Sequence, residues 1–165
     1  MKTRSAIQVL LLGLALAAPT SWAAGGSDGG SGGGSSLSVE DPEYAAGVAA
    51  IQAGRFDQAI ATLSAYVARV PNSADAENWL GYAYRRDGQL AAAFAHYDKA
   101  LAIDPKHRGA HEYVGEAFLM AGKLDKAEEH LKILDRLCWL PCEAYSDLKR
   151  AVADYKAGRR PVSTA

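Results

Sequence analysis

The stretch that decides the fold of this chain is Leu80-Gly81-Tyr82-Ala83-Tyr84, followed by Gly88-Gln89-Leu90, Ala93, Tyr97, Ala100-Leu101 and Asp104-Pro105. It predicts two short amphipathic helices joined by a turn at Gly88 and ended before Pro105. The pattern returns 34 residues away in both directions, in the sets Gly47, Gly81 and Gly115; Gly54, Gly88 and Gly122; and Ala59, Ala93 and Ala127. A fixed period of this length indicates stacked helical repeats.

We therefore expect an all-α protein built from three helix–turn–helix repeats. No alternating β-branched run bounded by turn residues predicts a strand. The expected segments are a signal peptide at 1–23, a flexible Gly/Ser-rich linker at 24–39, repeats at 40–73, 74–107 and 108–141, a capping helix at 142–157 and a frayed tail at 158–165. A cap is expected because the last repeat would otherwise leave its apolar face in water.

The N-terminal residues predict export. Lys2 and Arg4 precede an apolar run at 6–18, and Ser21-Trp22-Ala23 places small residues before a cleavage point after Ala23. This order is typical of a secretory signal peptide, which predicts a periplasmic or secreted protein. An uncleaved anchor is the alternative, although the run is shorter than the roughly 20 residues that span a bilayer. We expect no membrane insertion after cleavage.

The charge balance argues against nucleic acid as a partner. The chain has 18 Lys and Arg against 19 Asp and Glu, and cleavage would remove two of the basic residues. Proteins that bind nucleic acid usually present a basic patch or stripe, which this composition lacks. The Gly- and Ser-rich residues 25–36 predict a flexible coil rather than a charged tail.

The repeated residues resemble those of the tetratricopeptide repeat family. The second repeat carries the resemblance most fully, through Leu80, Gly81, Tyr84, Gly88, Ala93, Tyr97, Ala100 and Pro105. The resemblance implies a right-handed superhelical solenoid whose first helices line a concave groove. It also implies a non-enzymatic scaffold or adaptor that binds a peptide or partner protein, with no cofactor. A self-assembling structural module, joined by stacking of the repeats, is the alternative.

The resemblance places one set of residues in the groove. They are Tyr44, Val48, Ile51, Gln52, Asn78, Tyr82, Arg85, Arg86, Glu112, Glu116, Leu119 and Met120. Some family members clamp a carboxylate with basic and amide side chains, but the matching places here hold Tyr44, Val48 and Gly109, so no such clamp is expected. Arg85 and Arg86 either hold an acidic segment or are simply solvated.

Cys138 and Cys142 are the residues with the most obvious chemistry. In an exported protein we expect a short disulfide between them, with free thiols as the alternative. A thiol- or metal-handling function is a further alternative, although the spacing is not Cys-x-x-Cys. The four histidines do not form a zinc motif, so we expect structural roles and no metal site. No nucleophile elbow, phosphate loop or dinucleotide motif is present, so we expect no enzyme.

Trp139 stands where the first two repeats have Pro71 and Pro105. Because nothing at that place stops a helix, we expect the second helix of the third repeat to run longer than its counterparts. The chain would then turn at Leu140-Pro141-Cys142.

Overall fold

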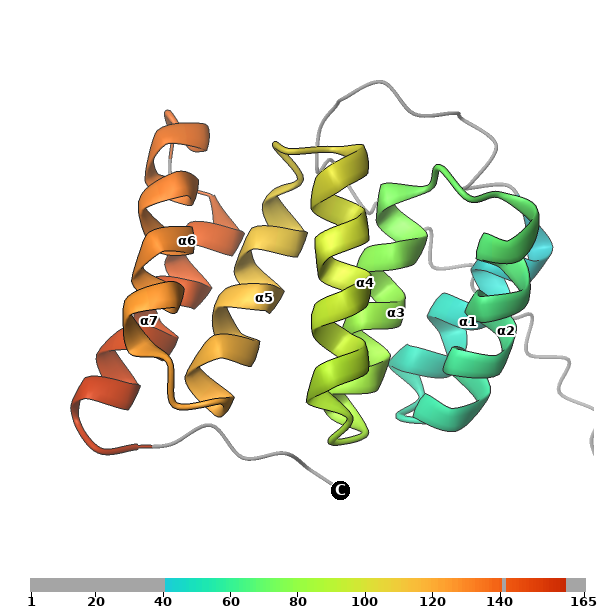
Figure 1. The fold of residues 1–165 in the computed structure, drawn as a ribbon, viewed down its shortest axis with the longest axis horizontal. Helices are drawn as coiled ribbons and strands as arrows, with labels where there is room; N and C mark the ends of the chain where they lie inside the picture. The colour runs from blue at the N-terminus through green and yellow to red at the C-terminus, as the bar shows by residue number, and fades with distance from the viewer. Residues whose placement is uncertain (1–40, 141, 160–165) are drawn as a thin grey trace, which may run out of the picture. The chain divides into compact units, whose positions relative to one another are not determined.

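The computed structural model describes residues 41–140 and 142–159. This part of the chain is all helical, and its seven helices are α1 (Pro42–Gln52), α2 (Phe56–Arg69), α3 (Ala74–Arg86), α4 (Leu90–Ile103), α5 (Arg108–Met120), α6 (Leu124–Leu137) and α7 (Glu143–Lys156) (Figure 1). The all-α prediction is confirmed. The expected signal peptide and linker lie outside the described residues. None of the described helices has the length and apolar character needed to cross a membrane.

Local sequence accounts for where the helices begin and end. Asp41 caps α1 by accepting a hydrogen bond from the Glu43 amide at 2.9 Å, and Pro42 occupies the first turn, where its missing N–H costs nothing. Gly54 ends α1 and Gly88 ends α3, with φ values of +70° and +79°. Glycine adopts this left-handed conformation at little cost, so it fixes the tight turn inside each helix pair.

The expected extension of the third repeat's second helix is wrong. α6 ends at Leu137, which corresponds by the 34-residue period to Ile103, the last residue of α4. The amide of Cys138 closes the helix on the carbonyl of Leu134 at 2.9 Å, as Asp104 does on Ala100 in α4. Cys138 is joined to Cys142 ahead of α7, and the helix ends without a proline at the place that Pro71 and Pro105 occupy in the first two repeats.

The repeated glycines are the points of closest approach between helices. A Cβ atom at Gly81 would lie 2.5 Å from Tyr97 of α4, and one at Gly47 would lie 2.6 Å from Leu63 of α2. At Gly115 the side chain in this position is Leu148 of α7, again 2.6 Å away. A large buried side chain therefore packs against each glycine, and any residue with a Cβ at that position would overlap it.

Helix α7 covers the end of the repeat array, as expected of a cap. Leu148 and Val152 are buried in a cluster with Leu119, Ala127 and Leu134 from α5 and α6. The side chains of Tyr145, Ala151 and Tyr155 pack against the same cluster. The apolar face of α7 is thus buried, while its charged residues Lys149 and Arg150 are exposed.

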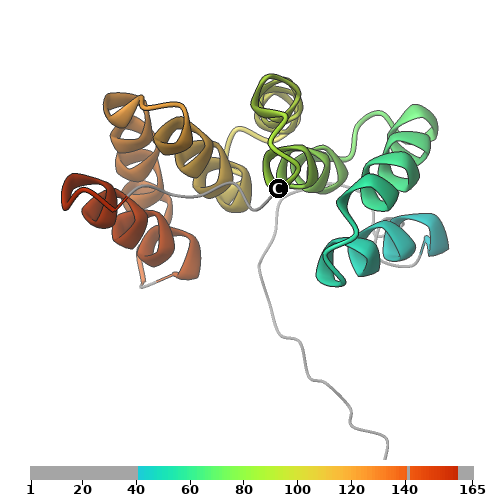
Figure 2. The same cartoon turned by 90° about the horizontal axis from the view of Figure 1, so that it is seen from below.

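The odd-numbered helices form the inner side of the repeat array. Helix α3 contacts both α1 and α5, and α5 contacts α7, whereas within the described residues α2, α4 and α6 do not contact one another. Figure 2 shows the resulting arc, with α3 on its inner side and α4 on its outer side. We call the side formed by α1, α3, α5 and α7 the inner face.

Replacing Gly81 with leucine should lower the free energy of unfolding by about 1–3 kcal/mol, because the new side chain overlaps the Tyr97 ring. Urea unfolding followed by circular dichroism measures the change. Ala91→Leu, at an exposed position of α4, is the control and should have little effect. Equal stability of Gly81→Leu and the wild type would contradict the packing described above.

Candidate functional site

The inner face carries three residues from each repeat, one helical turn apart. Residues that share a place in the repeat are Tyr44, Asn78 and Glu112; Val48, Tyr82 and Glu116; and Gln52, Arg86 and Met120. All but Asn78 are at least partly exposed. Because they lie on consecutive contacting helices, they form neighbouring rows on one surface.

A fourth predicted row is buried. Ile51, Arg85 and Leu119 share one place in the repeat, and they are only 7%, 7% and 1% exposed. Ile51 packs in a cluster with Ala59 and Leu63, and Leu119 belongs to the cluster beneath α7. Burial against neighbouring helices leaves little of these three side chains for a ligand, and their assignment to the groove stays a prediction.

An aromatic patch formed by Trp79, Tyr82 and Tyr113 spans α3 and α5. The ring centroids of Tyr82 and Tyr113 are 5.0 Å apart, and Trp79 lies 5.8 Å from Tyr82 and 6.2 Å from Tyr113. These three rings are partly exposed, so they offer apolar surface at the junction of two repeats. Trp79 and Tyr113 were missed as site residues, although they are 34 residues apart and therefore occupy the same place in successive repeats.

Arg85 is built into the structure rather than solvated. Its guanidinium binds the Glu116 carboxylate at 2.8 Å and donates to the Tyr97 hydroxyl at 3.3 Å. The same group lies 5.2 Å from the centroid of Tyr82 and 5.6 Å from that of Tyr113. Since Arg85 already has a carboxylate partner, an acidic ligand would have to displace Glu116.

Arg86 lies beside the aromatic patch on the same helix. It donates to the Tyr82 hydroxyl at 2.7 Å, and its guanidinium lies 5.0 Å from the centroid of Phe56 on α2. The guanidinium groups of Arg86 and Arg85 therefore both contact the Tyr82 ring. The two arginines position the patch, because each makes a cation–π contact with it.

Glu112 lies in an acidic part of the inner face, between α5 and α7. Burial, followed by the nearby carboxylates of Glu116 and Asp147, raises the pKa of Glu112 to about 8. Arg85 acts in the opposite direction but does not offset these effects. The buried neutral form of Glu112 is therefore favoured near neutral pH, because ionising it would place one more negative charge beside the others.

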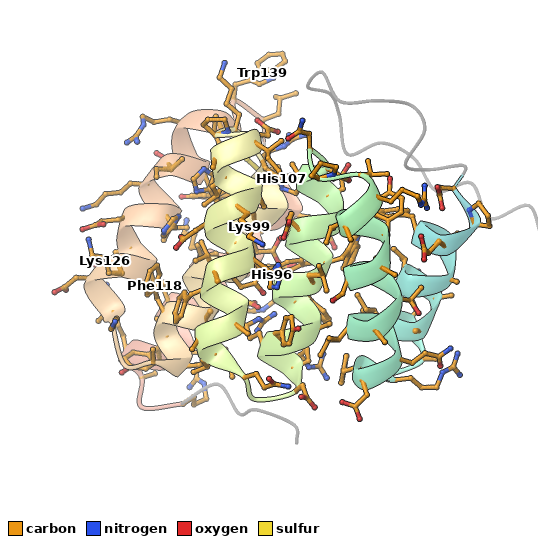
Figure 3. All side chains as sticks on the ribbon, turned by 45° about the vertical axis from the view of Figure 1, so that its right-hand side comes forward. His96, Lys99, His107, Phe118, Lys126 and Trp139 are labelled. Carbon is orange, nitrogen blue, oxygen red and sulfur yellow. A yellow bond between two sulfur atoms is a disulfide. The ribbon has the colours of Figure 1, made fainter. Side chains whose placement is uncertain are left out.

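The cysteine loop presents apolar side chains at the end of α6. The Sγ atoms of Cys138 and Cys142 are bonded at 2.02 Å, as in the expected disulfide. Between them Trp139 is 89% exposed and Leu140 is 59% exposed. Figure 3 shows Trp139 extending beyond the ends of the helices. This loop is a second apolar surface, separate from the aromatic patch.

The histidines pair with protein groups. His96 lies 2.6 Å from Glu77, and His107 lies 3.0 Å from Asp75. His111 donates from Nε2 to the Pro105 carbonyl at 3.0 Å, so its Nδ1 accepts a hydrogen bond from Nδ1 of His130 at 2.9 Å. Within residues 41–140 and 142–159, no group of histidine, cysteine or acidic side chains could hold a metal ion.

Comparisons with known proteins agree with this architecture. Two family models, both described as tetratricopeptide repeat, match residues 44–108 and 84–136, which together span more than half of the chain. A curated protein of Pseudomonas putida, strain KT2440, named probable biofilm formation methyltransferase WspC, is 36% identical over 86 residues. That match covers 52% of this chain but only 20% of the methyltransferase.

Solved structures share the same fold. The Yersinia enterocolitica type III secretion translocator chaperone SycD has 21% identity and a TM-score of 0.65, over 79% of this chain and 97% of SycD. SycD in complex with a peptide of the translocator YopD has 21% identity and a TM-score of 0.63, over 76% and 94%. The first repeat domain of Spaghetti (RPAP3), bound to the HSP90 peptide SRMEEVD, has 22% identity and a TM-score of 0.60, over 67% and 89%. At these identities the likeness concerns the fold alone.

Glu112→Gln should remove a destabilisation that grows with pH. The folded-state pKa is raised, so the folded protein holds a proton that the unfolded chain loses above its lower pKa, and wild-type stability falls between about pH 4.5 and 8. The variant should gain stability over the wild type at pH 8, by up to a few kcal/mol, and lose that advantage near pH 4.5. Urea unfolding at several pH values measures it.

Glu129→Gln, an exposed position on α6, is the control for this series. It should not reproduce the alkaline stabilisation, because Glu129 is ion-paired with Lys126 on the surface. A constant difference between Glu112→Gln and the wild type across this pH range would contradict the environment described for Glu112.

His130 should produce the opposite pH dependence. Burial, followed by the charge of His111, lowers the pKa of His130 to about 4. The unfolded chain therefore binds a proton that the folded protein does not, and stability falls as the pH drops from about 6.5 towards 4. Between pH 6.5 and 5 the wild type should lose about 2 kcal/mol more than His130→Gln. Parallel losses in urea unfolding of the two proteins would disprove this assignment.

Proposed function

Because this chain belongs to the tetratricopeptide repeat family, we propose that it is a non-enzymatic interaction module holding a segment of a partner protein on its inner face. The observation that carries this proposal is the aromatic patch, which is partly exposed although its rings are large. A bound segment would bury these rings, and aromatic side chains of this kind contribute most to many protein interfaces.

The related structures support a peptide as the ligand class. SycD is described in complex with a peptide of YopD, and the Spaghetti domain with the peptide SRMEEVD. Both proteins share this fold over most of their length. Which partner this chain holds is a separate matter, because the residues that line the inner face decide it.

We also propose that the protein acts after export, in the periplasm or outside the cell. The signal-like N-terminus supports export, as do the bonded sulfurs of Cys138 and Cys142. Disulfides persist in oxidising compartments and are rare in reducing ones. The disulfide would then serve to hold the loop between α6 and α7 rather than to carry out redox chemistry.

Selection of short random peptides displayed on phage tests the proposed function. The folded protein should enrich binders, and Trp79→Ala or Tyr82→Ala should weaken them at least about tenfold in fluorescence polarisation, because each variant truncates a central aromatic contact. Circular dichroism establishes that the variants are folded.

Trp139→Ala is the matched control for Trp79→Ala, because it removes the same side chain from the exposed loop. It should leave the affinity unchanged. Loss of binding in Trp139→Ala alone would assign the interaction to the cysteine loop, and failure to enrich any peptide would count against the proposed function itself.

A further inference from the structure

We propose that the segment held on the inner face places a lysine or arginine side chain against Glu112, next to the aromatic patch. This inference rests on the function proposed above and specifies the chemistry of the partner. Two features of the inner face support it: the ion pairs of its carboxylates, which already occupy Arg85, and an unsatisfied amide oxygen.

The carboxylates between α5 and α7 outnumber the cations that reach them. Four acidic residues gather there: Glu112, Glu116, Glu143 and Asp147. Arg85 binds Glu116 at 2.8 Å and Arg150 binds Asp147 at 2.7 Å. Across the described part of the chain, Glu112 has neither an ion pair nor a hydrogen bond to its side chain, although it is partly buried. A ligand cation would supply the missing partner.

Asn78 provides a second unsatisfied acceptor on the same two helices. It is only 4% exposed, and within the described residues its Oδ1 atom has no hydrogen-bond partner. The amide nitrogen of Asn78 lies close to α5: a Cβ atom on Gly109 would be 3.3 Å from it. Asn78 is one turn before Tyr82, and Gly109 is one turn before Tyr113. The unsatisfied groups along this junction, Glu112 and the enclosed Asn78 oxygen, are both acceptors, so the junction favours an incoming donor over a further acceptor.

The contacts that Arg85 already makes argue against an acidic partner segment. Its guanidinium is already held by Glu116 and the rings of Tyr82 and Tyr113. An incoming carboxylate would break that ion pair and add to the negative charge around Glu112. A basic side chain would instead favour loss of the Glu112 proton and pair with the resulting carboxylate next to Tyr113, whose ring face also favours a cation.

The electrostatics of Glu112 agree with this geometry. Burial and the neighbouring carboxylates raise the pKa of Glu112 to about 8, and Arg85 offsets these effects only in part. The preceding part of this chain offers no compensation, because residues 5–54 contain neither lysine nor arginine.

The phage-selected peptides test the inference directly. Lysine and arginine should be enriched over their frequency in the unselected library, and a selected peptide should bind at least about tenfold more weakly when its basic residue is replaced by glutamine. Glu112→Gln should weaken the affinity for the same peptide by a similar factor. In that variant, replacing the basic residue of the peptide should change the affinity little, because the two substitutions remove the same contact.

Glu129→Gln, on the opposite layer of helices, is the control and should leave binding unchanged. Enriched peptides without basic residues, whose binding still depends on Trp79 and Tyr82, would overturn this inference and leave the proposed function standing. Basic peptides that bind Glu112→Gln as tightly as the wild type would also overturn it. If no peptide is enriched, the proposed function fails, and this inference with it.

Discussion

The close approach of helices at Gly47, Gly81 and Gly115 determines how the rest of the molecule is arranged. At each glycine a large side chain from another helix fills the space that a Cβ would occupy. At Gly47 and Gly81 this contact joins the two helices of one repeat, and at Gly115 it joins α5 to the terminal helix α7. Helix α3 also contacts α1 and α5, whereas within the described residues the even-numbered helices do not contact one another. The inner face, and the aromatic patch on it, result from this packing rather than from any local feature of α3 or α5.

Much of this fold could be predicted from the sequence, because helix positions follow from local signals. The 34-residue period, the turn glycines and the spacing of apolar residues predict three helix pairs and a capping helix, and the described residues contain these seven helices. Contacts between helices that are distant in sequence could not be predicted in the same way. The partner of Gly115 is Leu148 of the terminal helix, not the residue of α6 that the period would suggest.

The candidate site was harder to predict, because adjacent places on one helix differ completely in burial. Gln52 is exposed while Ile51, one residue earlier, is buried between helices, and Arg86 and Arg85 differ in the same sense. Periodicity alone assigns both members of each pair to one side of the helix. The ion pair between Arg85 and Glu116 changes the chemistry of the inner face. Because Arg85 is bound to Glu116, it is not available to contact a ligand, and Glu112 has no cation paired with it among the described residues.

The most direct measurement of the central claim, that the inner face is the binding surface, is a backbone-amide NMR titration of the folded protein with a peptide that it binds. We predict that the largest shift changes lie on α3 and α5, around Tyr82 and Tyr113, and extend to the start of α7. Changes confined to α2, α4 and α6, or to the loop that carries Trp139, would contradict it.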